Sequence, residues 1–87
     1  ISGVVDRLVV EHDRVLVLDF KTDRPAPQDA AQVSAAYVLQ LALYRHVLQK
    51  VFPSRIVNCA LLWTEAPKLM LVPDHRLDLE LQRFLNS

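Results

Sequence analysis

Two apolar, β-branched runs near the start of the chain carry charged residues where a plain core strand would carry Val or Leu. The first run, residues 2–10, contains Asp6. The second run, residues 15–21, ends in Asp19, Phe20 and Lys21. Runs of this composition favour strands, and charges within them are costly unless they are paired or bind an ion. The two runs therefore predict a strand pair that brings its charges to a common place.

The polar residues 11–14 between the runs predict a short turn, and a two-residue or a four-residue loop gives the same strand pairing. In that register Asp6 lies directly opposite Asp19. Directly opposed residues have Cβ atoms about 4.5–5.5 Å apart and share a face of the sheet. The two-residue alternation of a strand adds Lys21 to that face and puts the intervening apolar residues on the other. Two acids and one amine are thus expected to face one another.

Two opposed carboxylates repel one another, and a divalent cation between them would turn this repulsion into binding. Mg²⁺ prefers oxygen ligands and usually keeps several waters. We expect Asp6, Asp19 and the backbone carbonyl of Phe20 to hold such an ion, with Lys21 placed to orient a nucleophile or stabilise charge on a phosphate. The alternative is a simple ion pair between Asp6 and Lys21 at the sheet edge. Gly3, three residues before Asp6, favours the site because glycine allows close approach of a backbone or substrate.

The remaining chain predicts a mixed sheet with helices packed on it. Residues 23–29 contain two prolines and form a connector. Asp29, with Gln32 three residues later, predicts a helix start by a capping box, and the helix runs to about Lys50. Strands are expected at residues 55–63 and 68–72, and a last amphipathic helix at 74–86. The order ββ-α-ββ-α places the fold in the α/β class, as an α+β mixed sheet in one domain spanning residues 1–87.

Composition sets limits on function. Ten basic and ten acidic residues balance, so there is no basic excess of the kind that marks autonomous nucleic-acid binding. Cys59 is the single cysteine, which excludes an internal disulfide and predicts a buried core thiol. No apolar run reaches the roughly 18–20 residues that span a bilayer, and no secretory signal pattern is present. The chain begins without Met, and we expect it to be part of a longer polypeptide.

Three motifs in this order resemble the C-terminal nuclease domain of AddA/RecB-type helicase-nucleases, which belong to the PD-(D/E)XK superfamily, and the resemblance is greatest to bacterial AddA. They are residues 3–8 (GVVDRL), residues 17–22 (VLDFKT) and the Gln40-x-x-x-Tyr44 element that follows Tyr37. The resemblance covers roughly residues 2–64 and implies a restriction-endonuclease-like core. It implies that Asp6 and Asp19 are acidic metal ligands and that Lys21 is the catalytic lysine.

The resemblance also implies that Gln40 and Tyr44 line the active site, whereas Tyr37 is expected to pack in the core. The alternative for Gln40 and Tyr44 is a helix face that packs on the sheet. Relatives carry a further helix upstream with a His or Glu near the metal, and this chain starts after it. His12, His46 and His75 are not convincing substitutes, so we expect weak metal binding and poor cleavage if that ligand is required.

The expected function is a Mg²⁺-dependent deoxyribonuclease, acting as an exonuclease domain, in a bacterial cytoplasmic helicase-nuclease that resects double-strand breaks for recombinational repair. Mn²⁺ is an alternative metal, and ATP would serve only the helicase part of the parent chain. The expected partners are single-stranded DNA and an AddB-like subunit, no membrane is expected, and the first strand could pair with a second copy. The alternatives are a non-catalytic nuclease-like scaffold and another RecB-like phage or CRISPR-associated exonuclease, although those commonly carry an iron–sulfur cluster held by several cysteines.

Overall fold

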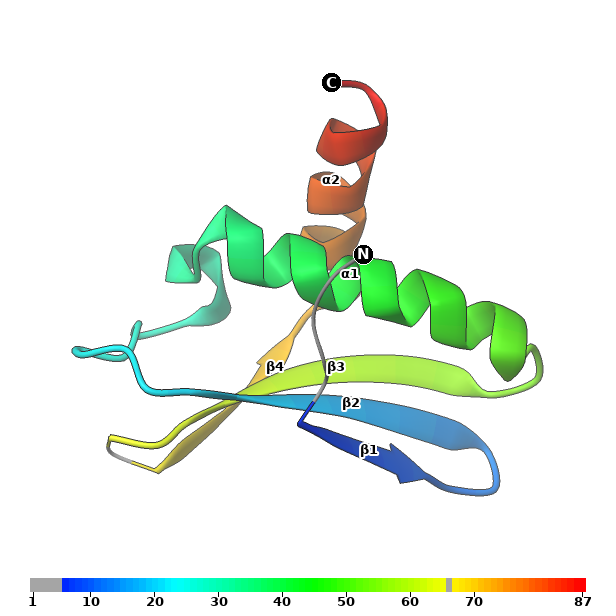
Figure 1. Cartoon of the computed structure of the whole chain (residues 1–87), viewed down its shortest axis with the longest axis horizontal. Coiled ribbons are helices and arrows are strands. Elements are labelled where there is room, and N and C mark those ends of the chain that lie inside the picture. The colour runs from blue at the N-terminus through cyan, green and yellow to red at the C-terminus, as the bar shows by residue number, and fades with distance from the viewer. Residues whose placement is uncertain (1–5, 66) are drawn as a thin grey trace.

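The computed structural model describes residues 6–65 and 67–87, and Figure 1 shows their arrangement. The elements, in chain order, are β1 (Arg7–Val10), β2 (Arg14–Lys21), a 3₁₀ helix η1 (Ala30–Gln32), α1 (Ala35–Val51), β3 (Ile56–Trp63), β4 (Lys68–Val72) and α2 (Asp74–Leu85). The predicted order ββ-α-ββ-α is confirmed. The fold is mixed α/β, with four strands in one sheet and the two long helices on one side of it.

The sheet has the order β1-β2-β3-β4. β1 and β2 form an antiparallel hairpin in which Arg7 lies opposite Leu18 and Val10 lies opposite Val15, which is the predicted register. β2 and β3 are parallel, because α1 carries the chain back across the sheet between them. β4 returns antiparallel to β3. β2 is therefore hydrogen-bonded on both edges.

The prediction that Asp6 lies within the first strand is wrong. β1 begins at Arg7, and Asp6 lies in a bend directly before it. The backbone N–H of Phe20, one position beyond Asp19 on β2, donates to Asp6 Oδ2 at 2.7 Å. The Asp6 side chain thus accepts a hydrogen bond that a backbone carbonyl would accept if β1 began earlier. Residues 1–5, which include Gly3, lie outside the described residues, so the predicted role of Gly3 stays a prediction.

The start of the long helix was predicted five residues too early. Asp29 does cap a helix, but it is the short η1, where the Asp29 side chain accepts from the N–H of Ala31. Val33 is extended, and α1 begins after Ser34, whose hydroxyl accepts from the N–H of Tyr37. Gln32 accepts from the N–H of Gln28 rather than completing a box with Asp29. Two local caps therefore divide what had been expected to be one helix.

The core lies between the sheet and α1. It combines alternate residues of β2 and β3 with Val38, Leu41 and Ala42 of α1. Cys59 is fully buried within it, as predicted, and burial raises the pKa of its thiol to about 12. None of the helices in the described part of the chain is long and apolar enough to cross a bilayer.

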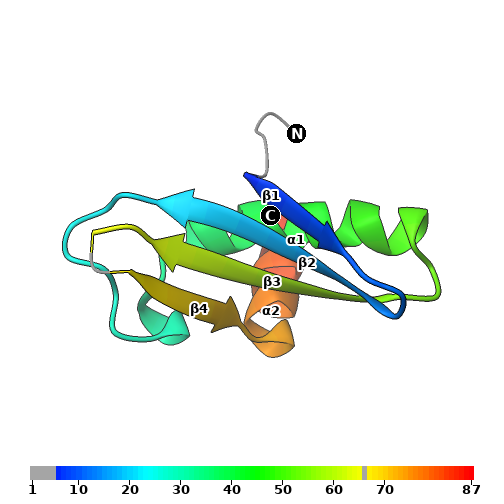
Figure 2. The same cartoon turned by 90° about the horizontal axis from the view of Figure 1, so that it is seen from below.

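The other face of the sheet carries no helix in the part of the chain that the structure describes (Figure 2). Phe20 of β2, Ile56 of β3 and Leu71 of β4 lie on it and are 40%, 60% and 64% exposed. The prediction that residues 55–63 are buried largely on both sides is therefore correct for the helix-facing side only. On the outer side Ala60 is buried, whereas Asn58 and Leu62 are half-buried.

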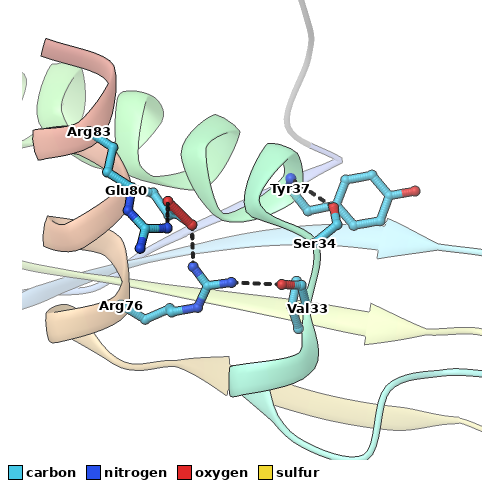
Figure 3. Close-up of polar contacts among 6 residues, drawn as sticks. All are labelled: Val33, Ser34, Tyr37, Arg76, Glu80 and Arg83. Atoms are coloured by element: carbon cyan, nitrogen blue, oxygen red, sulfur yellow. Dashed lines mark hydrogen bonds and ion pairs between the residues drawn. The ribbon is translucent and has the colours of Figure 1, made fainter. Parts of the chain in front are cut away.

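The last helix packs mainly on α1 and projects away from the sheet (Figure 1). Arg45 of α1, buried at the contact, pairs with Asp74 at 3.2 Å and with Asp78. Near the start of α2, Arg76 donates to the backbone carbonyl of Val33 at 2.7 Å and pairs with the buried Glu80 (Figure 3). Only the first half of the predicted amphipathic face is buried, because Phe84 and Leu85 lie beyond the end of the contact and are exposed.

Glu80→Gln should destabilise the fold by about 1–3 kcal/mol at pH 7, because it leaves the half-buried Arg76 with a weaker partner. Arg76, and then Arg83, lower the pKa of Glu80. A lowered folded-state pKa contributes stability above the unfolded-state pKa, and that contribution is lost as the pH falls through the folded-state value. The difference between wild type and variant should therefore shrink below about pH 4. Urea unfolding at pH 7 and pH 3 measures it, with the exposed Glu11→Gln as control; an unchanged difference at pH 3 would contradict the assignment.

Candidate metal and catalytic site

The end of β2 places an acid and a lysine side by side on the helix-facing side of the sheet. Asp19 and Lys21 are two residues apart and so project to the same face. Asp19 is 6% exposed, and Lys21 Nζ lies 2.9 Å from Asp19 Oδ2. The lysine side chain is itself largely buried. The pair is therefore sheltered from solvent, where its electrostatic interactions are stronger than at an open surface.

Asp6 completes the cluster from the other strand of the hairpin. Its Oδ2 accepts the N–H of Phe20, the residue next to Asp19, at 2.7 Å. Asp6 itself is exposed. Within the described residues the ion pair of Lys21 is with Asp19 and not with Asp6. The plain strand-to-strand pair between Asp6 and Lys21, weighed as the alternative, is therefore not what the structure has.

The pKa values of the two carboxyl groups are shifted in opposite directions. Burial raises the pKa of Asp19, and the neighbouring Asp6 raises it further. The pKa of Asp6 is lowered, first by the neighbouring carboxyl group of Asp19 and then by the N–H of Phe20. Two neighbouring carboxyl groups cannot both be ionised without an electrostatic cost. A bound divalent cation would reduce that cost.

The donors present match the modest requirements of Mg²⁺. They are the two carboxylates and the backbone carbonyl of Phe20, whose N–H already points to Asp6 at the edge where β1 begins. Mg²⁺ is typically bound by one or two carboxylates together with substrate phosphates. No group of three or more His, Cys, Asp or Glu side chains suited to a metal occurs among residues 6–65 and 67–87. The set thus fits a metal ion that shares its coordination with substrate and water.

Tyr37 is half-buried and packs against the core, as expected, and it also lies at this site. Lys21 Nζ sits 4.0 Å from the centroid of its ring, and the Tyr37 hydroxyl donates to the carboxylate of Asp23, 2.9 Å from each oxygen. The hydrogen bond with Asp23 raises the pKa of Tyr37. A signal for Asp23 is present in the sequence, because Asp19, Lys21 and Asp23 are each two residues apart. If the alternation continues beyond the strand, Asp23 lies on the same face as Asp19 and Lys21.

Gln40 and Tyr44 are half-buried on α1. No hydrogen bond or ion pair joins either of them to Asp6, Asp19 or Lys21 in the described part of the chain. The Tyr44 hydroxyl is buried and has no hydrogen-bond partner among the described residues. The structure therefore does not bring these two residues into the acid–lysine cluster, and their role stays a prediction. The three histidines are all exposed.

The mixed sheet with its helices is consistent with a restriction-endonuclease-like nuclease fold. The profile of the PD-(D/E)XK nuclease superfamily matches residues 1–77, so the chain belongs to that superfamily. The match includes both acids, the lysine and all of α1.

Curated relatives match shorter stretches. An ATP-dependent helicase/nuclease subunit from Desulforudis audaxviator is 34% identical over 56 residues, which is 64% of this chain and 5% of that protein. Proteins of the same name from Alkaliphilus oremlandii and Listeria welshimeri are 35% and 33% identical, over 59% and 70% of this chain and 4% and 5% of their own lengths. The matched part of this chain thus spans only about a twentieth of each relative. No solved structure gives a significant match.

Proposed function

We propose that this chain is the metal-dependent deoxyribonuclease domain of a helicase-nuclease that resects double-strand breaks for recombinational repair. The observation that carries the proposal is the cluster of Asp6, Asp19 and Lys21 at the end of the hairpin, in which Asp19 is buried and paired with Lys21 and Asp6 accepts the N–H of Phe20 beside it. Such an arrangement is costly in a purely structural hairpin, since burial and the neighbouring Asp6 both disfavour the ionised form of Asp19. A metal ion would relieve that cost.

In this proposal the residues have separate tasks. Asp6, Asp19 and the carbonyl of Phe20 would hold Mg²⁺ or Mn²⁺. The bound ion would supply Lewis-acid polarisation of the phosphodiester and activation of the attacking water. Lys21 is held by Asp19 and by the ring of Tyr37, and so presents a fixed positive charge where the scissile phosphate would develop negative charge. Gln40 and Tyr44 remain candidates for placing the DNA.

The proposed substrate is single-stranded DNA delivered by an ATP-driven helicase motor in the parent protein. Ten basic residues balance ten acidic ones, so the chain lacks a charge excess that would gather DNA by itself. A helicase motor that delivers the strand to the site would replace the electrostatic attraction that this chain lacks. The relatives are each named as one subunit of an ATP-dependent helicase/nuclease, which supports action in the bacterial cytoplasm together with an AddB-like partner. We propose exonucleolytic cleavage as the mode.

Cleavage of a labelled single-stranded oligonucleotide tests the proposal, both by this chain and by the longer polypeptide proposed to contain it. We expect cleavage in Mg²⁺ or Mn²⁺, none in EDTA, and a metal-dependent rise in melting temperature of this chain, because an ion that binds only the folded state stabilises it by mass action. A melting temperature that does not respond to either metal, together with no cleavage by the longer polypeptide, would leave only a non-catalytic scaffold.

A further inference from the structure

A cavity of about 550 Å³ opens beside the acid–lysine cluster. It lies between the connector that follows β2, the start of α1 and the end of β3. Its walls include Tyr37 and Trp63, whose ring centroids are 6.3 Å apart. Its volume falls within the roughly 300–1,000 Å³ of small-ligand pockets. The cavity therefore has room for a planar ring system of nucleobase size.

The chemistry of the walls is suited to an uncharged heterocycle. The two prolines and the half-buried ring of Tyr37 supply flat apolar surface in front of the buried Trp63, and the side chains of Gln28 and Gln32 supply amide donors and acceptors. The single charged residue of the lining is Asp23, which is negative and already accepts the Tyr37 hydroxyl. A phosphate would be repelled from such a cavity, whereas a base would find both a stacking surface and hydrogen-bonding groups.

The walls are also held in place. Lys68 of β4 donates to the backbone carbonyl of Gln28 at 2.8 Å and to that of Pro27 at 3.4 Å. Gln32 accepts from the N–H of Gln28. These contacts tie the connector to the far strand of the sheet and to η1. The cavity is thus pre-organised, which reduces the ordering cost of binding.

Tyr37 belongs both to this cavity and to the surroundings of Lys21, whose Nζ lies 4.0 Å from its ring centroid. A positive charge suited to phosphate therefore stands next to an uncharged pocket suited to a base. We propose that the cavity receives one unpaired nucleobase of the strand whose neighbouring phosphate lies at Lys21. This inference rests on the proposed function, since it assigns that site a place for the substrate base.

The test compares two tetranucleotides in EDTA, so that neither metal nor cleavage is involved. One is (dT)₄, and the other has the same phosphates but no bases. Trp63 is the single tryptophan of the chain and lines the cavity, so its fluorescence reports binding. We expect (dT)₄ to change the Trp63 emission and to bind about tenfold more tightly than the abasic strand, as base stacking alone supports. Gln32→Ala, which removes an amide, and Ala26→Leu, which fills space at the wall, should bring the ratio close to one.

Gln49→Ala, an exposed glutamine near the other end of α1, is the matched control and should keep the wild-type ratio. Equal binding of the two strands by the wild-type chain would overturn the inference, as would a tenfold ratio that survives in both cavity variants. Failure of this inference can be distinguished from failure of the proposed function. Base-dependent binding without any cleavage would retain the cavity and reject the nuclease, whereas metal-dependent cleavage without a base effect would do the reverse.

Discussion

Lys21→Ala is expected to reduce DNA cleavage by about 10²–10³-fold or more while the protein remains folded, because loss of one fixed charge-stabilising group in a sheltered site has effects of this size. Lys21 is the positive charge that stands at the acid pair, held 2.9 Å from Asp19 Oδ2 and above the ring of Tyr37. Its removal takes away a charge that competes with a metal ion for Asp19. The metal-dependent rise in melting temperature should therefore persist or increase.

The measurement is single-turnover cleavage at saturating metal, paired with thermal unfolding with and without metal. Lys50→Ala, on the exposed last turn of α1, is the matched control and should cleave like wild type. Wild-type cleavage by Lys21→Ala would remove the lysine from the catalytic assignment. If Lys21→Ala shows no cooperative unfolding transition, the variant is not folded. Lys21 would then be needed for folding, because it offsets the charge of the buried Asp19.

Asp19→Asn should abolish both cleavage and the stabilisation by metal. The amide keeps the shape of the side chain and can still hydrogen-bond to Asp6, but it offers no charge to a divalent cation. At a metal concentration 100 times the dissociation constant, wild type gains about 2.7 kcal/mol, and the variant should gain nothing. Without metal, the variant should be at least as stable as wild type above neutral pH, since the raised pKa of Asp19 means that its ionisation opposes folding.

Differential scanning fluorimetry over a range of Mg²⁺ and Mn²⁺ concentrations measures this effect. Asp13→Asn, in the exposed turn between β1 and β2, removes one acid without touching the cluster and should keep the full response to metal. An Asp19→Asn variant whose melting temperature still rises with metal would show that the ion binds elsewhere in the protein.

Local alternation was enough to predict the hairpin and the shared face of Asp19 and Lys21, but not the placement of Asp6, which lies in a bend before β1 and is held by the N–H of Phe20. Val15, Val17 and Asp19 alternate with less buried residues along β2, and this period, with the polar turn before it, determines both the register and the face that Asp19 and Lys21 share. The parallel pairing of β2 with β3 was also predictable, because a helix between two buried strands makes a crossover the natural connection.

The features that the sequence did not predict depend on contacts between residues that are distant in the chain. Tyr37 packs against the core as its spacing along α1 predicts, but its contacts with Asp23 and Lys21 were not predicted. The early helix start followed from a good cap at Asp29, where a second cap at Ser34 takes over. The position of α2 depends on Arg45, a charged residue buried between helices, which a hydrophobic pattern cannot indicate.

The site has a part that is fixed by the sheet and a part that tolerates substitution. Asp19 and Lys21 are paired with Leu61 and Trp63 of β3, and they directly follow the four residues of β2 that are paired with both β1 and β3. The wall of the neighbouring cavity is a connecting segment, and such segments tolerate substitution far better than strands do. Substitutions in the connecting segment could thus change which DNA strands bind in the cavity without moving Asp19 or Lys21.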